Sequence, residues 1–368
     1  MKNRRKIGFI IILTIIILIT PKIIKNFKST MVSSKDEVHL IKEIETGYDE
    51  DIIYIKTKDG IIQYWDGILY AYDVMGAQTW NTHLGIINPI IKVKENSVYI
   101  VDNNTNQLVK IDEKGEVLYR YTFESPLNNF SIDDDGYIIL QYPLENNMVK
   151  LKILNEEGRP YSEILLTEGD VMNTSISKEY DFVAVNTLIT NNVLESRILT
   201  YDIKGQLIGS NQLDDQLVLE FGYDKKGNLI TITEEEVFAI DKDNKILWKT
   251  PIDKIKKIEK LPHEYMVFYC QQQRKNPFVH AGGEEDLKIM KYDGKVIGKG
   301  RLDEEILGLD LDMERIVLHS NRSIYLLDRK GKLKKEHKYT SDIENVFVFP
   351  KGYLTVIYKG KISFYKIN

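Results

Sequence analysis

Apolar and polar residues alternate in short runs through most of the chain, and turns rich in Asp, Asn and Gly separate the runs. That pattern is typical of β-strands with one buried side. The clearest example is residues 237–250, VFAIDKDNKILWKT, where two strands flank a polar turn at residues 241–244. These residue types suit a tight reversal, so the stretch predicts a β-hairpin. The same hairpin recurs in six further stretches: residues 69–80, 108–119, 151–162, 198–209, 287–298 and 324–335.

The spacing of this hairpin is close to regular. Its turn falls at residues 76, 115, 158, 205, 244, 294 and 331, at intervals of 39, 43, 47, 39, 50 and 37. The intervals average about 42 residues, which is the period of four-stranded propeller blades. The repeats also show four short strand patterns with a turn signal at each junction. The sequence therefore predicts an all-β fold, a β-propeller built as one large repeat domain.

The two ends of the repeat region complement each other. Residues 343–368 supply three strand patterns where a blade needs four, and residues 38–45, VHLIKEIE, form a strand pattern that no other repeat needs. We expect the first strand to pair with residues 361–368 and to close an eight-bladed ring without open ends. A seven-bladed ring with one stray hairpin is the alternative.

The N-terminal residues predict a membrane anchor. A basic cluster at residues 2–6 precedes an unbroken apolar run at residues 7–20. Fourteen helical residues span about 21 Å and a bilayer core measures about 30 Å, so we expect the membrane segment to continue to residue 24. A cleaved signal peptide would begin in the same way, but the sequence offers no small-residue cleavage site.

These observations predict a domain order and a location. The order is an N-terminal membrane anchor at residues 1–25, a tether at residues 26–37 and a β-propeller at residues 38–368. A short basic N-terminus favours the inner side of the cytoplasmic membrane. We therefore expect a single-pass protein whose propeller lies on the extracytoplasmic side.

Composition excludes some classes of function. The formal net charge is -5 and 29% of residues are charged, which gives no electrostatic reason to expect nucleic acid as a partner. Cys270 is the only cysteine, so the chain can form neither an intramolecular disulfide nor a cysteine-based metal cluster. No G-x-S-x-G, P-loop, H-E-x-x-H or Rossmann pattern occurs.

Two hairpins share a more specific pattern, an Ala-apolar-Asp stretch, then a turn position, then a tryptophan four residues later. The residues are Ala71, Tyr72, Asp73, Gly76 and Trp80 in one hairpin, and Ala239, Ile240, Asp241, Asn244 and Trp248 in the other. The pattern resembles the repeat of pyrroloquinoline-quinone-type, WD40-like β-propellers, in which the tryptophan packs between blades. The resemblance implies that these residues hold the repeat together: Asp73, Gly76, Trp80, Asp112, Gly115, Asp202, Gly205, Asp241, Trp248, Asp328 and Gly331.

The remaining hairpins match this repeat only in part. Tyr119 takes the tryptophan position in one, and the others carry Ser162, Gly209, Gly298 and Lys335 there. Quinone-dependent dehydrogenases of the family use calcium, a catalytic aspartate and two adjacent cysteines. The lone Cys270 cannot supply that pair, and no position matches the calcium ligands or the aspartate, so we predict no cofactor, metal or catalytic residue. In architecture the chain is similar to the outer-membrane assembly lipoprotein of Gram-negative bacteria and to single-anchor propellers of Gram-positive bacteria.

Sorting the loops by face gives the first candidate site. In a four-stranded blade, the loop between the second and third strands shares a face with the connection to the next blade. In the sixth blade that loop, residues 271–286, is far longer than a median connection of about five residues. Long loops on rigid scaffolds often carry binding residues, here Arg274, Phe278 and His280. A tolerated insertion without a ligand is the alternative.

Acidic connections between blades give the second candidate. Carboxylates would ring the same face, namely Glu124, Glu168, Asp170, Asp214, Asp215, Asp253, Asp303, Glu304, Glu305, Asp342 and Glu344. The candidates for binding a partner are Asp214, Asp215, Asp303, Glu304 and Glu305. A negative rim attracts a basic peptide, a cationic ligand or a divalent ion, whereas the simpler interpretation is solvated loop charge. Residues 131–138, SIDDDGYI, have some features of a calcium loop, but a tight turn accounts for them.

The function that these patterns favour is non-catalytic. We expect a membrane-anchored binding or scaffold protein for a protein or peptide partner at the cell envelope, attached to the membrane through residues 7–24. A divergent quinone- or metal-dependent enzyme, or a ligand-binding sensor that uses the propeller channel, is the alternative.

Overall fold

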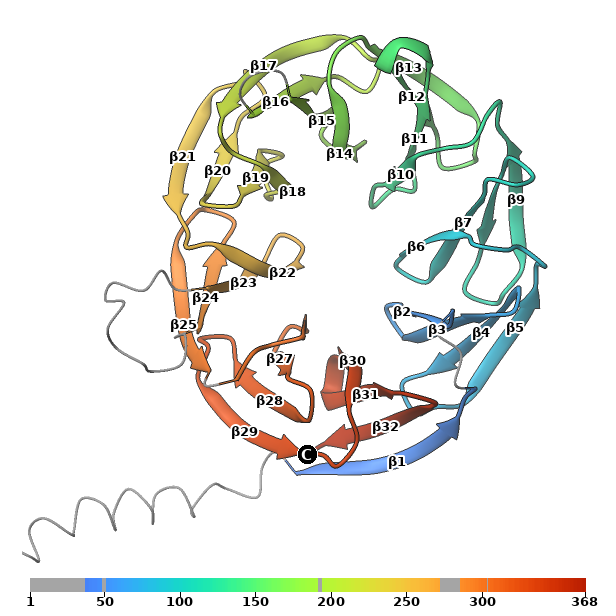
Figure 1. The fold of residues 1–368 in the computed structure, drawn as a ribbon, viewed down its shortest axis with the longest axis vertical. Coiled ribbons are helices and arrows are strands. Elements are labelled where there is room, and N and C mark those ends of the chain that lie inside the picture. The colour runs from blue at the N-terminus through green and yellow to red at the C-terminus, as the bar shows by residue number, and fades with distance from the viewer. Residues whose placement is uncertain (1–36, 48–50, 191–193, 272–284, 303) are drawn as a thin grey trace, which may run out of the picture.

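The computed structural model describes residues 37–368 except for 48–50, 191–193, 272–284 and 303. It forms eight antiparallel sheets of four strands each. The sheets stand radially around a central axis, so that each is one blade of a closed ring (Figure 1). The predicted eight-bladed β-propeller is confirmed, and the seven-bladed alternative is wrong.

Blades 1 to 4 each take four consecutive strands, from the innermost to the outermost. Their strands are β2 (Ile53–Lys56), β3 (Gly60–Trp65), β4 (Ile68–Asp73) and β5 (Gln78–His83); β6 (Ile90–Lys94), β7 (Ser97–Asp102), β8 (Gln107–Ile111) and β9 (Val117–Thr122); β10 (Asn129–Ile132), β11 (Ile138–Pro143), β12 (Val149–Leu154) and β13 (Pro160–Leu166); and β14 (Asp170–Ser177), β15 (Phe182–Thr190), β16 (Leu194–Tyr201) and β17 (Leu207–Asp214).

Blades 5 to 7 follow the same plan, and blade 8 takes its outermost strand from the start of the chain. The strands are β18 (Val218–Tyr223), β19 (Leu229–Thr233), β20 (Glu236–Ile240) and β21 (Ile246–Pro251); β22 (Ile255–Leu261), β23 (Tyr265–Gln271), β24 (Glu285–Lys291) and β25 (Val296–Leu302); β26 (Gly308–Leu311), β27 (Arg315–His319), β28 (Ser323–Asp328) and β29 (Leu333–Lys338); and β30 (Ile343–Phe349), β31 (Tyr353–Tyr358), β32 (Lys361–Ile367) and β1 (Val38–Glu45). Two short 3-10 helices, η1 (Glu145–Asn147) and η2 (Pro350–Gly352), complete the described elements.

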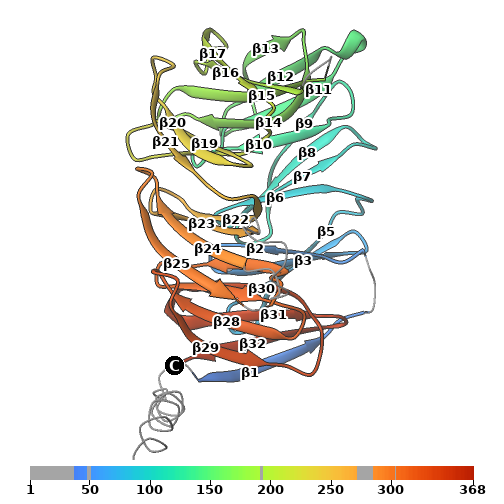
Figure 2. The ribbon, with the colours of Figure 1, turned by 60° about the vertical axis from the view of Figure 1, so that its left-hand side comes forward.

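The ring closes by pairing its first and last strands. β1 runs antiparallel to β32, with Val38 opposite Ile367 and Glu45 opposite Lys361. The two strands lie side by side in both views of the ring (Figures 1 and 2). Beyond the strand ends, the Asn368 amide donates to the Glu37 carbonyl at 3.1 Å. The predicted closure is therefore confirmed.

The repeat residues act through the backbone of the hairpin turn. The Oδ1 atom of Asp73 accepts the amides of Met75 at 2.9 Å and Ala77 at 2.8 Å. Asp112, Asp241 and Asp328 form the same pair of bonds, and Asp202 forms the second of them. These bonds replace water at the turn, which explains why aspartate recurs there.

The glycine of the turn has positive φ, for example 83° at Gly115. Asn244 adopts φ 62° at the equivalent place, as asparagine tolerates the left-handed region better than most residues. Trp80 packs on the turn of the next blade, and its Nε1 donates to the Glu113 carbonyl at 2.8 Å. A Cβ at Gly115 would lie 2.7 Å from the Trp80 ring, so the glycine also makes room for the aromatic side chain.

The core is divided among the interfaces between blades. The buried apolar residues form eight clusters, and each cluster joins two neighbouring blades. The second and third strands of each blade supply most of these side chains. Packing on both sides fixes each blade, so the loops at the two ends of the blades stand on a rigid scaffold.

The antiparallel order gives the ring two different faces. We call the loop face the one that carries the connections between blades and those between second and third strands. The turn face carries the other hairpin turns. Because Val38 lies beside the end of β32, the described chain begins on the turn face. None of the described residues forms a helix long and apolar enough to cross a bilayer, and the predicted anchor at residues 7–24 lies outside them.

Candidate functional site

Several of the predicted rim carboxylates are neutralised by neighbouring cations. Glu124 pairs with Lys150 at 2.7 Å and with Lys152 at 3.0 Å. Glu168 pairs with Arg197 at 3.2 Å, and Asp253 pairs with Lys288. These ion pairs lie on the loop face, as predicted, but they leave little net charge at their positions.

Four rim carboxylates without an ion pair lie in pairs at two of the connections between blades. Asp214 and Asp215 lie between blades 4 and 5, and Glu304 and Glu305 lie between blades 6 and 7. All four side chains are exposed, and none forms an ion pair within the part of the chain that the structure describes. These are four of the five carboxylates that the sequence indicates as candidates for binding a partner. The fifth, Asp303, lies outside the described residues, as do Arg274, Phe278 and His280.

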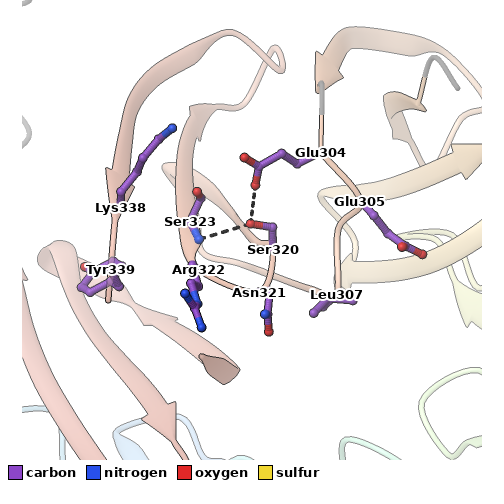
Figure 3. A pocket seen from close by; sticks show the side chains of 9 residues that line it. All are labelled: Glu304, Glu305, Leu307, Ser320, Asn321, Arg322, Ser323, Lys338 and Tyr339. Carbon is purple, nitrogen blue, oxygen red and sulfur yellow. Dashed lines mark hydrogen bonds between the residues drawn. The ribbon is translucent and has the colours of Figure 1, made fainter. Parts of the chain in front are cut away.

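One of these two places has a cavity beside it. The cavity lies over blade 7 on the loop face and has a volume of about 680 Å³ (Figure 3). The link from β25 to β26, the connection from β27 to β28 and the end of β29 form its walls. Its lining residues are Glu304, Glu305, Leu307, Ser320, Asn321, Arg322, Ser323, Lys338 and Tyr339.

Backbone hydrogen bonds hold these walls in place. The Leu307 amide donates to the His319 carbonyl at 2.8 Å, which fastens the link between blades to blade 7. The Ser320 amide donates to the Ser323 carbonyl at 2.9 Å and closes a tight turn. The Tyr339 amide donates to the Arg322 carbonyl at 2.8 Å. The cavity is thus bordered by segments that are tied together through the main chain.

Glu304 is fixed at the cavity wall by neutral groups. The Ser320 hydroxyl donates to Oε2 of Glu304 at 2.6 Å. The Ser323 amide donates to the Ser320 oxygen at 3.2 Å, so the serine hydroxyl is itself oriented. Hydrogen bonds from Ser320 and Tyr325 lower the pKa of Glu304 below its usual value. The carboxylate is therefore charged at neutral pH and points toward Ser320 across the cavity (Figure 3).

The other side of the cavity carries a cation and aromatic surface. Lys338 pairs with Glu336 at 3.3 Å and remains exposed. The Tyr339 ring packs against Tyr358 and Tyr365, with centroids 6.1 Å away in both cases. The cavity therefore offers an anion on one wall and a cation on the other.

Sequence reasoning missed most of this lining. It selected Glu304 and Glu305, but not Ser320, Arg322 or Lys338. The one available signal was that residues 320–322 connect the second and third strands of a blade and so belong on the loop face. Asp214 and Asp215 line no part of this cavity.

A second group of charges lies on the innermost strands. Lys56 of blade 1 donates to both carboxylate oxygens of Asp310 in blade 7, at 2.8 and 2.7 Å. Asp310 also accepts the Val348 amide of blade 8 at 2.7 Å. Glu259 of blade 6 interacts electrostatically with Asp310, and burial together with that charge raises its pKa to about 7. These groups join blades across the ring closure.

Metal ligation has no support from the described side chains. No group of three or more His, Cys, Asp or Glu residues among them could hold an ion. Within the acidic stretch at residues 131–138, Asp133 accepts the amides of Tyr137 at 2.7 Å and Lys178 at 2.8 Å. Asp134 pairs with Lys94. Hydrogen bonds to backbone amides and an ion pair therefore account for these two aspartates.

The fold defines the class of protein, an eight-bladed β-propeller. The chain belongs to a family of unknown function, DUF5711, whose model matches residues 31–367. No curated protein matches the sequence.

Solved structures of other propellers resemble the chain in fold. BamB from Moraxella catarrhalis has 12% sequence identity and a TM-score of 0.53, with 90% of this chain and 98% of BamB covered. The C-terminal WD40 domain of Sif2 has 9% identity and a TM-score of 0.64, with 91% and 100% covered. Sqt1 from Saccharomyces cerevisiae has 10% identity and a TM-score of 0.56, with 91% and 99% covered. At these identities the likeness shows the fold alone.

Proposed function

We propose that this protein is a non-catalytic binding or scaffold protein of the cell envelope, anchored in the cytoplasmic membrane with its propeller outside. Its loop face binds a segment of a partner protein. The observation that carries the proposal is the cavity beside Glu304, which presents a fixed carboxylate that forms no ion pair with a described residue. Loops on a rigid scaffold are a usual location for recognition, and opposite charge speeds the encounter with a partner.

The direction of the chain supports this arrangement. The described chain begins on the turn face, and the apolar run at residues 7–20 precedes it in the sequence. A propeller tethered at its turn face directs its loop face away from the membrane. The cavity would then be accessible to proteins of the cell envelope.

A crosslinking capture experiment tests the proposal. The full chain is expressed in its own cells, crosslinked and purified together with its bound proteins. Replacing Asp214, Asp215 and Glu305 with lysine should remove the captured partner. A control variant reverses two exposed carboxylates on the turn face, Glu113→Lys and Asp243→Lys, and should retain it. Identical partner sets for both variants and the unmodified chain would count against the loop face.

The alternative function is an enzyme or a sensor that uses the propeller channel. Its best support in the structure is Glu259, which lies on an innermost strand. A carboxyl whose pKa is about 7 could exchange protons at neutral pH. Its neighbours are already engaged, because Asp310 binds Lys56 and Glu220 binds Lys260. These contacts favour a structural role for the cluster, so the loop face is the better candidate.

A further inference from the structure

The carboxylate of Glu304 is positioned before any partner arrives. The Ser323 amide orients the Ser320 hydroxyl, and that hydroxyl donates to Glu304 (Figure 3). Ser320 is 5% exposed and Ser323 is 3% exposed, so both belong to the packed wall of the cavity. A group held in this way loses little conformational freedom when it binds a ligand, which favours affinity.

The same carboxylate forms no ion pair with a described cation, although the Lys338 ammonium group attracts it across the cavity. Its hydrogen bonds come from neutral groups, and no described cation lies within ion-pair distance of it. Lys338 lies on the opposite wall, where its ammonium group pairs with Glu336. Other loop-face carboxylates, such as Glu124 and Glu168, already have a basic partner. Glu304 can therefore still form an ion pair with a cation from outside.

The rest of the cavity suits a long basic side chain. Leu307 borders it and is 45% exposed, which offers apolar contact to an aliphatic stem. The volume of about 680 Å³ exceeds what one side chain fills, so an extended peptide also fits. On the far wall, the Lys338 ammonium group can donate to a main-chain carbonyl of such a peptide.

We propose that this cavity binds an arginine side chain of the partner, with the guanidinium group against Glu304 and the stem against Leu307. Arginine fits better than lysine because its planar guanidinium group is weakly hydrated and presents several donors to a fixed carboxylate. The inference rests on the proposed function, because it identifies the chemistry of the segment that the loop face binds.

The test compares two short peptides on the full chain in nanodiscs. The probes are Ac-Gly-Ser-Arg-Ser-Gly-NH2 and the same peptide with citrulline, which is nearly isosteric with arginine but neutral. Isothermal titration should show that the arginine peptide binds roughly tenfold more tightly than the citrulline peptide, the effect of about one charge-assisted hydrogen bond. Equal affinity for the two peptides, or no binding of either, would overturn the inference.

Variants then locate the effect. Glu304→Gln should abolish the preference for arginine and leave citrulline binding unchanged. Glu305→Gln should reduce the preference much less, because Glu305 accepts no bond from Ser320 and points away from it (Figure 3). The turn-face variant Asp243→Asn controls for net charge, and thermal melts confirm that each variant is folded. Retention of the full preference in Glu304→Gln would also overturn the inference.

The outcomes separate this inference from the proposed function. If loop-face charge reversal removes the captured cellular partner but the peptides show no dependence on Glu304, only the arginine assignment falls. If the peptides behave as expected while the captured partners do not change, the proposed function falls instead.

Discussion

Single residues decide how the blades turn and how they contact each other. The aspartate at the start of four repeat turns accepts amides two and four residues ahead, as at Asp112. Where the aromatic residue is replaced by Gly209, the Asn244 side chain fills the space and donates to the Ser210 carbonyl at 3.2 Å. At this hairpin, the Asn244 side chain thus takes the space of the missing aromatic residue.

Gly115→Ala tests this packing. The new Cβ would lie 2.7 Å from the Trp80 ring, at a φ of 83°. We expect a loss of about 2–4 kcal/mol in the free energy of unfolding, measured with urea. Gly222→Ala is the matched control, because its nearest atom lies at 3.5 Å from the new Cβ. Equal stability of the two variants would show that the glycine turn is not constrained as described.

Glu259 predicts a pH dependence of stability. Its pKa in the folded protein, about 7, is above its usual value of 4.5. The contribution of Glu259 to the free energy of unfolding is therefore fully present below about pH 4.5, and it is lost as the pH rises through 7. Glu259→Gln should be more stable than the unmodified chain at pH 8, on the order of 2 kcal/mol, and should differ little at pH 5. The charged groups near Glu259 are Asp310, Glu220 and Lys56. Urea titrations at both pH values measure the difference, with Glu314→Gln as an exposed control. A constant difference between pH 5 and pH 8 would contradict the assignment.

At the scale of elements, the strands and the closure could be predicted because their signals are local. Alternation with a period of two marks each strand, and aspartate with glycine marks each turn. The cavity could not be predicted in the same way. Residues 320–322 form a short connection of ordinary turn residues, and their position beside Glu304 depends on how blade 7 meets the link that precedes it. The partners of Glu124 and Glu168 also come from neighbouring strands, so their neutralisation is a tertiary effect.

β1 acts mainly through its backbone, since most of its side chains are exposed. Its removal would leave β32 with an open edge. A chain that begins at Thr46 should therefore melt at a lower temperature and self-associate with rising concentration, as measured by calorimetry and light scattering. A chain that begins at Glu37 retains β1 and is the control. Equal melting temperatures and a monomeric state for both chains would contradict the closure.

At the scale of the whole molecule, an ion pair reinforces the ring closure from inside. Lys56 of blade 1 reaches Asp310 of blade 7, which also binds the backbone of blade 8. β1 joins the same region from the outer edge of blade 8. The ring is thus closed at the outer edge of blade 8 by β1, and near the axis by Lys56 and Asp310.

Lys56→Met should remove the inner connection. Asp310 is 7% exposed, so its carboxylate would be left buried without a cation, at a cost of about 3 kcal/mol in the free energy of unfolding. Lys58→Met removes an exposed pair with Glu95 and should cause no measurable change. Chemical denaturation of both variants measures the free energy of unfolding. A similarly small loss in both would show that the inner ion pair is dispensable.

The most direct test of the account asks which face of the ring meets a partner. A photo-crosslinking amino acid is placed at Asn321 on the loop face or at Lys330 on the turn face, both of which are exposed. Cells that express the full-length variants are irradiated, and the adducts are identified by mass spectrometry. The proposed function predicts a specific protein adduct from position 321 and none from position 330. Adducts from position 330 alone, or from neither position, would contradict it.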